Sequence, residues 1–95
     1  MPFLRKVVLH SLSGYRPELD ALVQQFMADG VAYVGVVGVD ASRIEDIIME
    51  LCVRDGSAPY TMLNSFHEHE TLSEVVAFAQ SLTGEFAGDV QVVEF

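Results

Sequence analysis

Residues 31–56 have the sequence VAYVGVVGVDASRIEDIIMELCVRDG, in which an uncharged run is followed by an amphipathic pattern. The run 31–39 is rich in valine, which is typical of a β-strand that is buried on both faces. Apolar side chains then recur at positions 44, 47, 48, 51 and 52, which is the spacing of one helix face. Gly56 follows, and glycine commonly ends a helix. This stretch therefore predicts a buried strand that leads into a helix.

The same succession of strand and helix occurs before and after this stretch. Residues 5–12 have the apolar content of a strand, and a helical stripe at positions 19, 22, 23 and 26 leads to Gly30. Residues 60–66 form a third strand pattern, and a stripe at positions 72, 75, 76, 79 and 82 leads to Gly84. Residues 90–95 have the partly polar pattern of an edge strand. The predicted order of elements is βαβαβαβ.

This order predicts a small three-layer α/β domain over residues 1–95, with a four-stranded, mostly parallel sheet. Right-handed crossovers between parallel strands place the helices on the faces of the sheet. Two strand orders fit: 2-1-3-4, in which the second strand is an edge, and 3-2-1-4, in which it is central. The absence of charge in 31–39 favours the central position. An edge strand that pairs with the same strand of a second copy is the alternative.

Two short motifs predict helix starts. Thr71 and Glu74 match a capping box, in which each side chain binds the backbone N–H of the other residue. Ser42 and Glu45 match the same pattern, with Asp40 just upstream as a rival cap.

The charge balance limits the classes of partner. The chain has 14 acidic and 5 basic side chains, and its formal net charge is −9. Nucleic acids and anionic membranes bind clustered Lys and Arg, so this balance argues against both. A basic protein partner fits the charge. The hydrophobic share of 51% is high for a chain of this length and predicts self-association, most simply as a homodimer.

The cysteine and the apolar runs bear on the cellular compartment. Cys52 is the only cysteine, so no intrachain disulfide forms, and its place on the helical stripe predicts a buried thiol. No run reaches the roughly 18 apolar residues that a membrane span needs. We therefore expect a cytoplasmic protein.

All three histidines lie at or just past the predicted carboxyl ends of strands, where ligands bind in open α/β sheets. His67 and His69 point to one side of an extended segment and are spaced to share a divalent metal, with zinc the leading candidate. A third ligand would be His10 in the order 2-1-3-4 or Asp40 in the order 3-2-1-4. The alternative is a solvated loop before a helix, with no cofactor.

A second candidate site is the segment that follows the first strand. It contains Ser11, Ser13, Gly14 and Arg16 ahead of a helix N-terminus, where backbone N–H groups and the helix dipole favour an anion. The alternative is an ordinary loop in which Arg16 pairs with a nearby acidic side chain. The sequence contains no P-loop, no nucleophile elbow and no dinucleotide fingerprint, so it predicts no catalytic residue.

The stretch 63–78, LNSFHEHETLSEVVAF, resembles small bacterial α/β domains of unknown function. In those domains a strand ends on an aromatic residue and a histidine, and an acidic residue and a capped helix follow. The resemblance carries no activity with it. Composition and motifs together predict a non-catalytic, acidic interaction module that acts as a homodimer. The alternative is a metal- or anion-binding domain, open to an enzymatic role, that uses His67, His69 and either His10 or Arg16.

Overall fold

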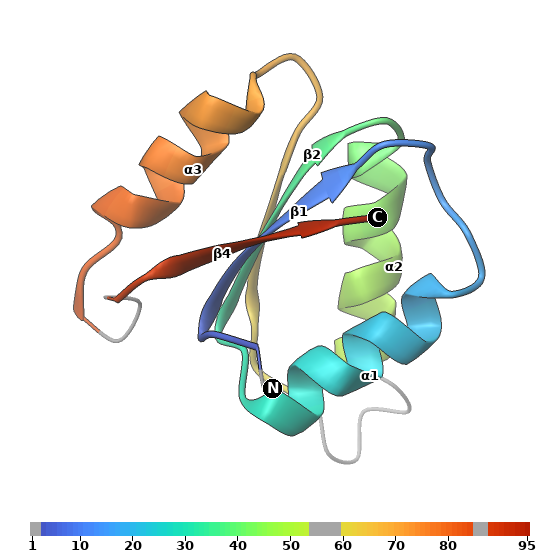
Figure 1. Cartoon of the computed structure of the whole chain (residues 1–95). Helices are drawn as coiled ribbons and strands as arrows, with labels where there is room; N and C mark the ends of the chain where they lie inside the picture. Colours follow the sequence, from blue (N-terminus) through green and yellow to red (C-terminus); the bar gives the residue numbers. More distant parts are fainter. Residues whose placement is uncertain (1–2, 54–59, 85–87) are drawn as a thin grey trace.

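The structure is a computed structural model, and it describes residues 3–53, 60–84 and 88–95 (Figure 1). Strands and helices alternate along the chain in the predicted order. The elements are β1 (Lys6–Ser11), α1 (Leu19–Asp29), β2 (Tyr33–Gly38), α2 (Ala41–Val53), β3 (Leu63–His67), α3 (Leu72–Ser81) and β4 (Val90–Glu94).

The four strands form one parallel sheet in the order β3-β2-β1-β4. This is the 3-2-1-4 arrangement, so the order 2-1-3-4 is excluded. β2 is a central strand and is buried from Tyr33 to Val37, as its lack of charge predicts. The alternative in which the second strand is an open edge that pairs with a second copy is therefore wrong. The open edges of the sheet belong to β3 and β4.

The strand order determines which face each helix covers. From β1 through β2 to β3 the chain moves in one direction across the sheet, so right-handed crossovers place α1 and α2 on the same face. The crossover from β3 to β4 runs back the other way and places α3 on the opposite face (Figure 1). The result is the three-layer arrangement that the sequence predicts.

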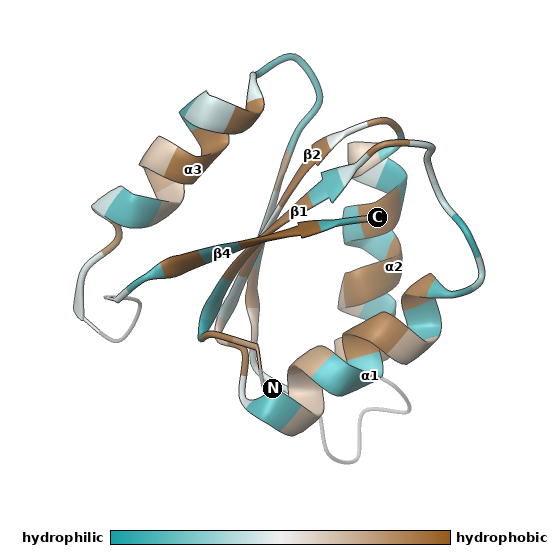
Figure 2. Ribbon diagram, in the orientation of Figure 1, coloured by the Kyte–Doolittle hydropathy of each residue, from teal (hydrophilic) through white to brown (hydrophobic). Residues whose placement is uncertain are grey.

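Each face of the sheet has its own hydrophobic core, and β2, which contributes to both, is mostly hydrophobic in Figure 2. Alternate strand residues point to opposite faces, so Val7 packs with α1 and α2 while Val8 packs with α3. The predicted helical stripes supply the remainder: Ile48 of α2 is fully buried in the first core, and Val75 of α3 is fully buried in the second. Cys52 is buried in the first core, as predicted.

The helix caps follow the predictions in part. The capping box of Thr71 and Glu74 is present at the start of α3, and Gly30, with φ of 79°, ends α1. The capping box predicted at positions 42 and 45 is wrong, because α2 begins at Ala41 and Ser42 lies inside its first turn. Asp40 precedes that helix with φ of 57°, and its backbone oxygen accepts a hydrogen bond from the Ile44 N–H.

Three further boundaries differ from the sequence prediction or fall outside the structure. Gly56 lies outside the described residues. The C-cap of α3 is Leu82, so the helix ends before Gly84. β3 begins at Leu63, later than predicted, because Tyr60 makes its hydrogen bonds to Cys52 and Val31 outside the strand ladder.

One buried polar group is unexpected. Lys6 on β1 is only 1% exposed, and its Nζ donates a hydrogen bond of 2.7 Å to the backbone oxygen of Ala79. The Ala79 oxygen also accepts from the Leu82 N–H at 3.3 Å, and it lies at the negative end of the helix dipole, which favours a cation. The Lys6 ammonium therefore connects the central sheet to the end of α3.

Among the described residues, no helix has the length and apolar character that crossing a membrane requires.

Candidate functional site

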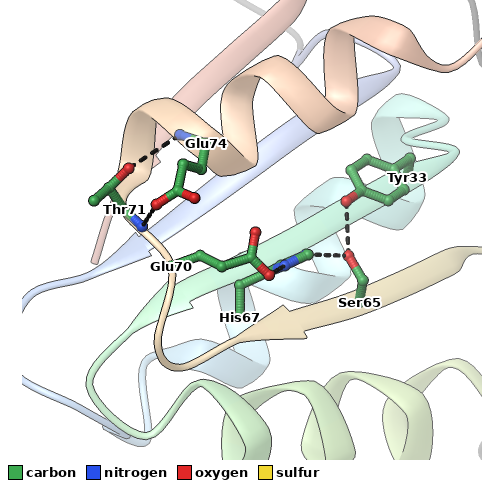
Figure 3. Close-up of polar contacts among 6 residues, drawn as sticks. All are labelled: Tyr33, Ser65, His67, Glu70, Thr71 and Glu74. Atoms are coloured by element: carbon green, nitrogen blue, oxygen red, sulfur yellow. Dashed lines mark hydrogen bonds and ion pairs between the residues drawn. The ribbon is translucent and has the colours of Figure 1, made fainter.

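Four polar side chains form a continuous hydrogen-bonded chain beside β3 (Figure 3). The hydroxyls of Tyr33 and Ser65 lie 2.7 Å apart, and Ser65 Oγ lies 2.8 Å from His67 Nε2. His67 Nδ1 lies 2.9 Å from Glu70 Oε1. We refer to Tyr33, Ser65, His67 and Glu70 as the polar array.

Strand alternation and sheet register bring these residues together. Ser65 and His67 are two residues apart on β3 and therefore point to the same face, the one covered by α3. Ser65 lies opposite Gly35 on β2, and the side chain of Tyr33 extends over Gly35. A Cβ atom at Gly35 would lie 2.5 Å from the Tyr33 hydroxyl oxygen. Gly35 is therefore required for the ring of Tyr33 to reach Ser65.

The direction of each hydrogen bond follows from the chemistry of the groups. An ionised Glu70 carboxylate only accepts, so His67 Nδ1 carries the proton in that bond. When the imidazole is neutral, Nε2 is then the acceptor, and the Ser65 hydroxyl donates to it. Ser65 Oγ has only lone pairs left for Tyr33, so the Tyr33 hydroxyl donates to Ser65. Every donor in the polar array is thus directed toward Glu70.

The array runs from the interior to the surface. Tyr33 is fully buried, the side chain of His67 is 10% exposed and that of Glu70 is 46% exposed. Burial raises the pKa of the Tyr33 phenol; the Ser65 hydrogen bond acts against this shift, and the negative charge of Glu70 adds to it. The ring of Phe78 on α3 lies 5.7 Å from that of His67 and 6.3 Å from that of Tyr33.

This arrangement has the chemical components of an activated hydroxyl. A base lies within hydrogen-bonding distance of the Ser65 hydroxyl, and a carboxylate orients that base. A neutral phenol lies on the other side of the same oxygen. The polar array is therefore the candidate site with the most complete geometry in the described part of the chain.

The residues predicted to bind a metal are dispersed. His67 directs its two ring nitrogens to Ser65 and Glu70, and His69 is exposed beyond the end of β3. Residues 3–53, 60–84 and 88–95 contain no group of three or more His, Cys, Asp or Glu side chains arranged to hold a metal ion. His10 is half-buried on β1. Asp40 Oδ2 accepts a hydrogen bond from the Tyr15 N–H at 3.2 Å.

In the predicted anion-binding loop, the polar and charged groups contact other groups of the same chain. Ser11 Oγ accepts from the Gly14 N–H at 3.2 Å, and the guanidinium of Arg16 lies 4.3 Å from the centre of the Phe95 ring. The carboxylate of Asp40 closely approaches Gly14 and accepts from the next N–H in the loop. The loop thus binds a carboxylate that the chain supplies, while Ser13 is exposed.

Sequence reasoning selected His67 but missed its partners. The same-face spacing of Ser65 and His67, with Glu70 three residues later, was visible in the sequence and is the signal that would have found them. Tyr33 gave no such signal, because its place beside Ser65 depends on the pairing of β2 with β3.

Comparisons with known proteins give the chain a family. No curated protein and no solved structure matches it. A family model described as a domain of unknown function (DUF7684) matches residues 1–93, and this range includes the stretch 63–78 that resembles such domains. The chain therefore belongs to the domain of unknown function family DUF7684.

Proposed function

We propose that this domain is an acidic interaction module that forms a homodimer through the open edge of β3. The observation that carries this proposal is one edge strand that combines exposed apolar side chains with main-chain groups that have no strand partner among the described residues. Leu63 and Phe66 are 43% and 49% exposed, although both belong to a strand of the sheet.

The hydrogen-bonding pattern of β3 defines which backbone groups are open. The Leu63 N–H donates to the Ala32 oxygen at 2.9 Å, toward β2. Residues of a parallel edge strand alternate in direction, so Ser65 and His67 also pair with β2. The backbone N–H and C=O groups of Asn64 and Phe66 therefore point away from the sheet, where a further strand can pair with them.

The edge formed by β3 is a better candidate than the edge formed by β4. β3 exposes the two large apolar side chains Leu63 and Phe66, whereas β4 exposes Val92. An exposed apolar edge strand is an aggregation hazard unless another strand or element covers it. Pairing with a second copy would bury Phe66 and satisfy the open backbone groups.

A two-fold axis gives the simplest form of this pairing. Two copies of β3 related by such an axis run antiparallel, and the same surface patch serves both copies. With the axis at Ser65, the middle residue of the strand, Asn64 of each copy lies opposite Phe66 of the other and exchanges main-chain hydrogen bonds with it. The two sheets then form one continuous sheet.

The net charge of the chain affects both the dissociation constant of the dimer and the kind of protein that the dimer binds. Two copies that each carry a net charge of −9 repel one another, so added salt strengthens the dimer by screening. The same charge favours a basic protein as the partner that the dimer binds.

Sedimentation velocity on two matched variants tests the dimer. Phe66→Lys places a charge on the β3 edge, and Val92→Lys places the same charge on the β4 edge, where the native side chain is exposed to a similar extent. We expect the wild type and Val92→Lys to be dimers whose dissociation constant falls as salt is added, and Phe66→Lys to be a monomer. A wild type that stays monomeric at high salt would contradict the proposal. So would equal dissociation constants for the two variants.

A further inference from the structure

The polar array supports a chemical activity in addition to an interaction role. We propose that Ser65 is a nucleophile that small, neutral carboxylic esters acylate, with His67 as its general base. Glu70 acts through His67 as a positioning residue, and the Tyr33 hydroxyl is the donor for the oxygen that becomes negative during attack.

The first support is the direct contact between nucleophile and base. Ser65 Oγ and His67 Nε2 are 2.8 Å apart, which is within the range needed for proton transfer. The proton arrangement set by Glu70 leaves Nε2 as the acceptor of the Ser65 proton. The 2.9 Å bond from Nδ1 to Glu70 also stabilises the imidazolium that forms when His67 takes this proton.

The second support is a neutral donor next to the reacting oxygen. The Tyr33 hydroxyl lies 2.7 Å from Ser65 Oγ and is held there by a fully buried ring. When Ser65 Oγ attacks a carbonyl group, the carbonyl oxygen develops negative charge one bond away from the new Oγ–carbon bond. The Tyr33 hydroxyl is then close enough to donate to it, as donors in an oxyanion hole do. The raised pKa of Tyr33 keeps this donor protonated.

The surroundings of Ser65 indicate the class of substrate. Leu63 lies on the same face of β3 two residues away, and Phe78 of α3 lies beside His67; both side chains are more than 40% exposed. These apolar groups favour a small uncharged acyl group. The exposed carboxylates of Glu68 and Glu70 oppose an anionic one.

The reaction is balanced with water as the only co-reactant. Ser65 Oγ forms a bond to the acyl carbon, and its proton moves to His67 Nε2. The bond between the acyl carbon and the leaving oxygen breaks, and the leaving group takes that proton and departs as an alcohol. Water then attacks the acyl–serine ester and transfers a proton to His67, which returns it to Ser65 as the carboxylic acid leaves.

The activity does not require the proposed dimer, because all four residues of the polar array belong to one copy. In the two-fold pairing proposed above, Ser65 lies opposite Ser65 of the second copy and His67 lies opposite its Leu63, so the second copy borders the site without supplying a reacting group. The activity therefore requires neither the dimer nor a basic partner, and its test is separate from the sedimentation experiment.

Covalent labelling with a small alkyl fluorophosphonate tests the nucleophile. Attack by Ser65 Oγ forms an oxygen–phosphorus bond and releases fluoride, and the Ser65 proton goes to His67. We expect peptide mass spectrometry to find one label, on Ser65. No label, or a label on another residue in place of Ser65, would overturn the proposal without recourse to any variant.

Variants test the role of the base. We expect His67→Gln to slow labelling of Ser65 by about a hundredfold or more, as loss of a general base does. Ser73→Ala, which removes an exposed serine from α3, should label at the wild-type rate. Circular dichroism confirms that each variant is folded. Equal labelling rates for folded His67→Gln and wild type would rule out His67 as the base.

Hydrolysis of p-nitrophenyl acetate separates the role of Glu70 from a structural one. Glu70→Gln keeps an oxygen that accepts from Nδ1 but removes the charge that stabilises the imidazolium. We expect kcat to fall while KM stays at the wild-type value. A change in KM alone, or unchanged kcat, would show that Glu70 does not act through His67.

Discussion

The side chain of Tyr33 combines a fully buried ring with a hydroxyl that belongs to the polar array. Burial raises the pKa of this phenol above 10.0, because the charged phenolate loses its hydration; the nearby Glu70 charge adds to the shift and the Ser65 hydrogen bond reduces it. The folded protein therefore keeps the Tyr33 proton at a pH where the unfolded chain releases it.

The pH dependence of stability follows from that shift. The contribution of Tyr33 is fully present below its unfolded pKa and is lost as the pH rises from there through the folded pKa, because the unfolded state then binds fewer protons. In an ultraviolet titration of the folded protein, we expect Tyr33→Phe to remove a phenolate component that ionises above pH 10.0. We also expect the free energy of unfolding of this variant to fall less steeply with pH in that range. Loss of a component that ionises at or below pH 10.0 would contradict this reading.

At the scale of the single element, α3 has the clearest local signal in the sequence. Thr71 Oγ1 accepts from the Glu74 N–H at 3.2 Å, and Glu74 Oε1 accepts from the Thr71 N–H at 3.0 Å. We expect Thr71→Ala to lower the free energy of unfolding by about 1 kcal/mol, because the first turn loses a capping acceptor. Thr71→Ser keeps the hydroxyl and should lie closer to wild type. Urea denaturation measures both, and equal losses for the two variants would mean that the hydroxyl is not what stabilises this helix start.

Two elements, β2 and α2, show which features of the fold sequence patterns predict and which they do not. The uncharged run 31–39 favours a central strand, and the structure has a central strand there. The run alone also fits an edge strand that a second copy covers, and only the strand order decides between the two. The capping pattern at Ser42 and Glu45 fails, because two capping signals overlap there and Asp40, in a left-handed conformation, starts the helix earlier. The Asp40 side chain accepts from the Tyr15 N–H in the loop between β1 and α1, and local spacing does not reveal a contact between residues 25 positions apart.

The candidate site, too, is only partly predictable from local sequence patterns. The positions of Ser65, His67 and Glu70 relative to one another follow from local spacing, so this part of the site was predictable in principle. The contact with Tyr33 links residues 32 positions apart and requires both the strand order and the register of Gly35 opposite Ser65. No periodicity in the sequence contains that information.

At the scale of the whole molecule, the two layers that cover the sheet are unequal. Among the described residues, the core under α1 and α2 contains 13 buried residues, whereas the core under α3 contains five. Hydrophobic stabilisation scales with the apolar area removed from water, so α3 is held to the sheet less strongly than the other two helices. Lys6 adds to this weaker attachment through its buried hydrogen bond to Ala79.

The smaller core under α3 predicts which helix exchanges its amide hydrogens fastest. Regions with fewer buried contacts exchange their amide hydrogens through local opening, so the amides of α3 should exchange faster than those of α1 and α2.

Lys6→Met keeps the apolar stem but leaves the Ala79 oxygen without its ammonium donor, so it should speed amide exchange in α3 while exchange in α1 and α2 stays unchanged. Hydrogen exchange measured by mass spectrometry compares the helices within one sample. If Lys6→Met raised exchange equally in all three helices, Lys6 would stabilise the molecule as a whole instead. A selective effect would show that Lys6 specifically stabilises the attachment of α3, the helix that carries Phe78 beside His67.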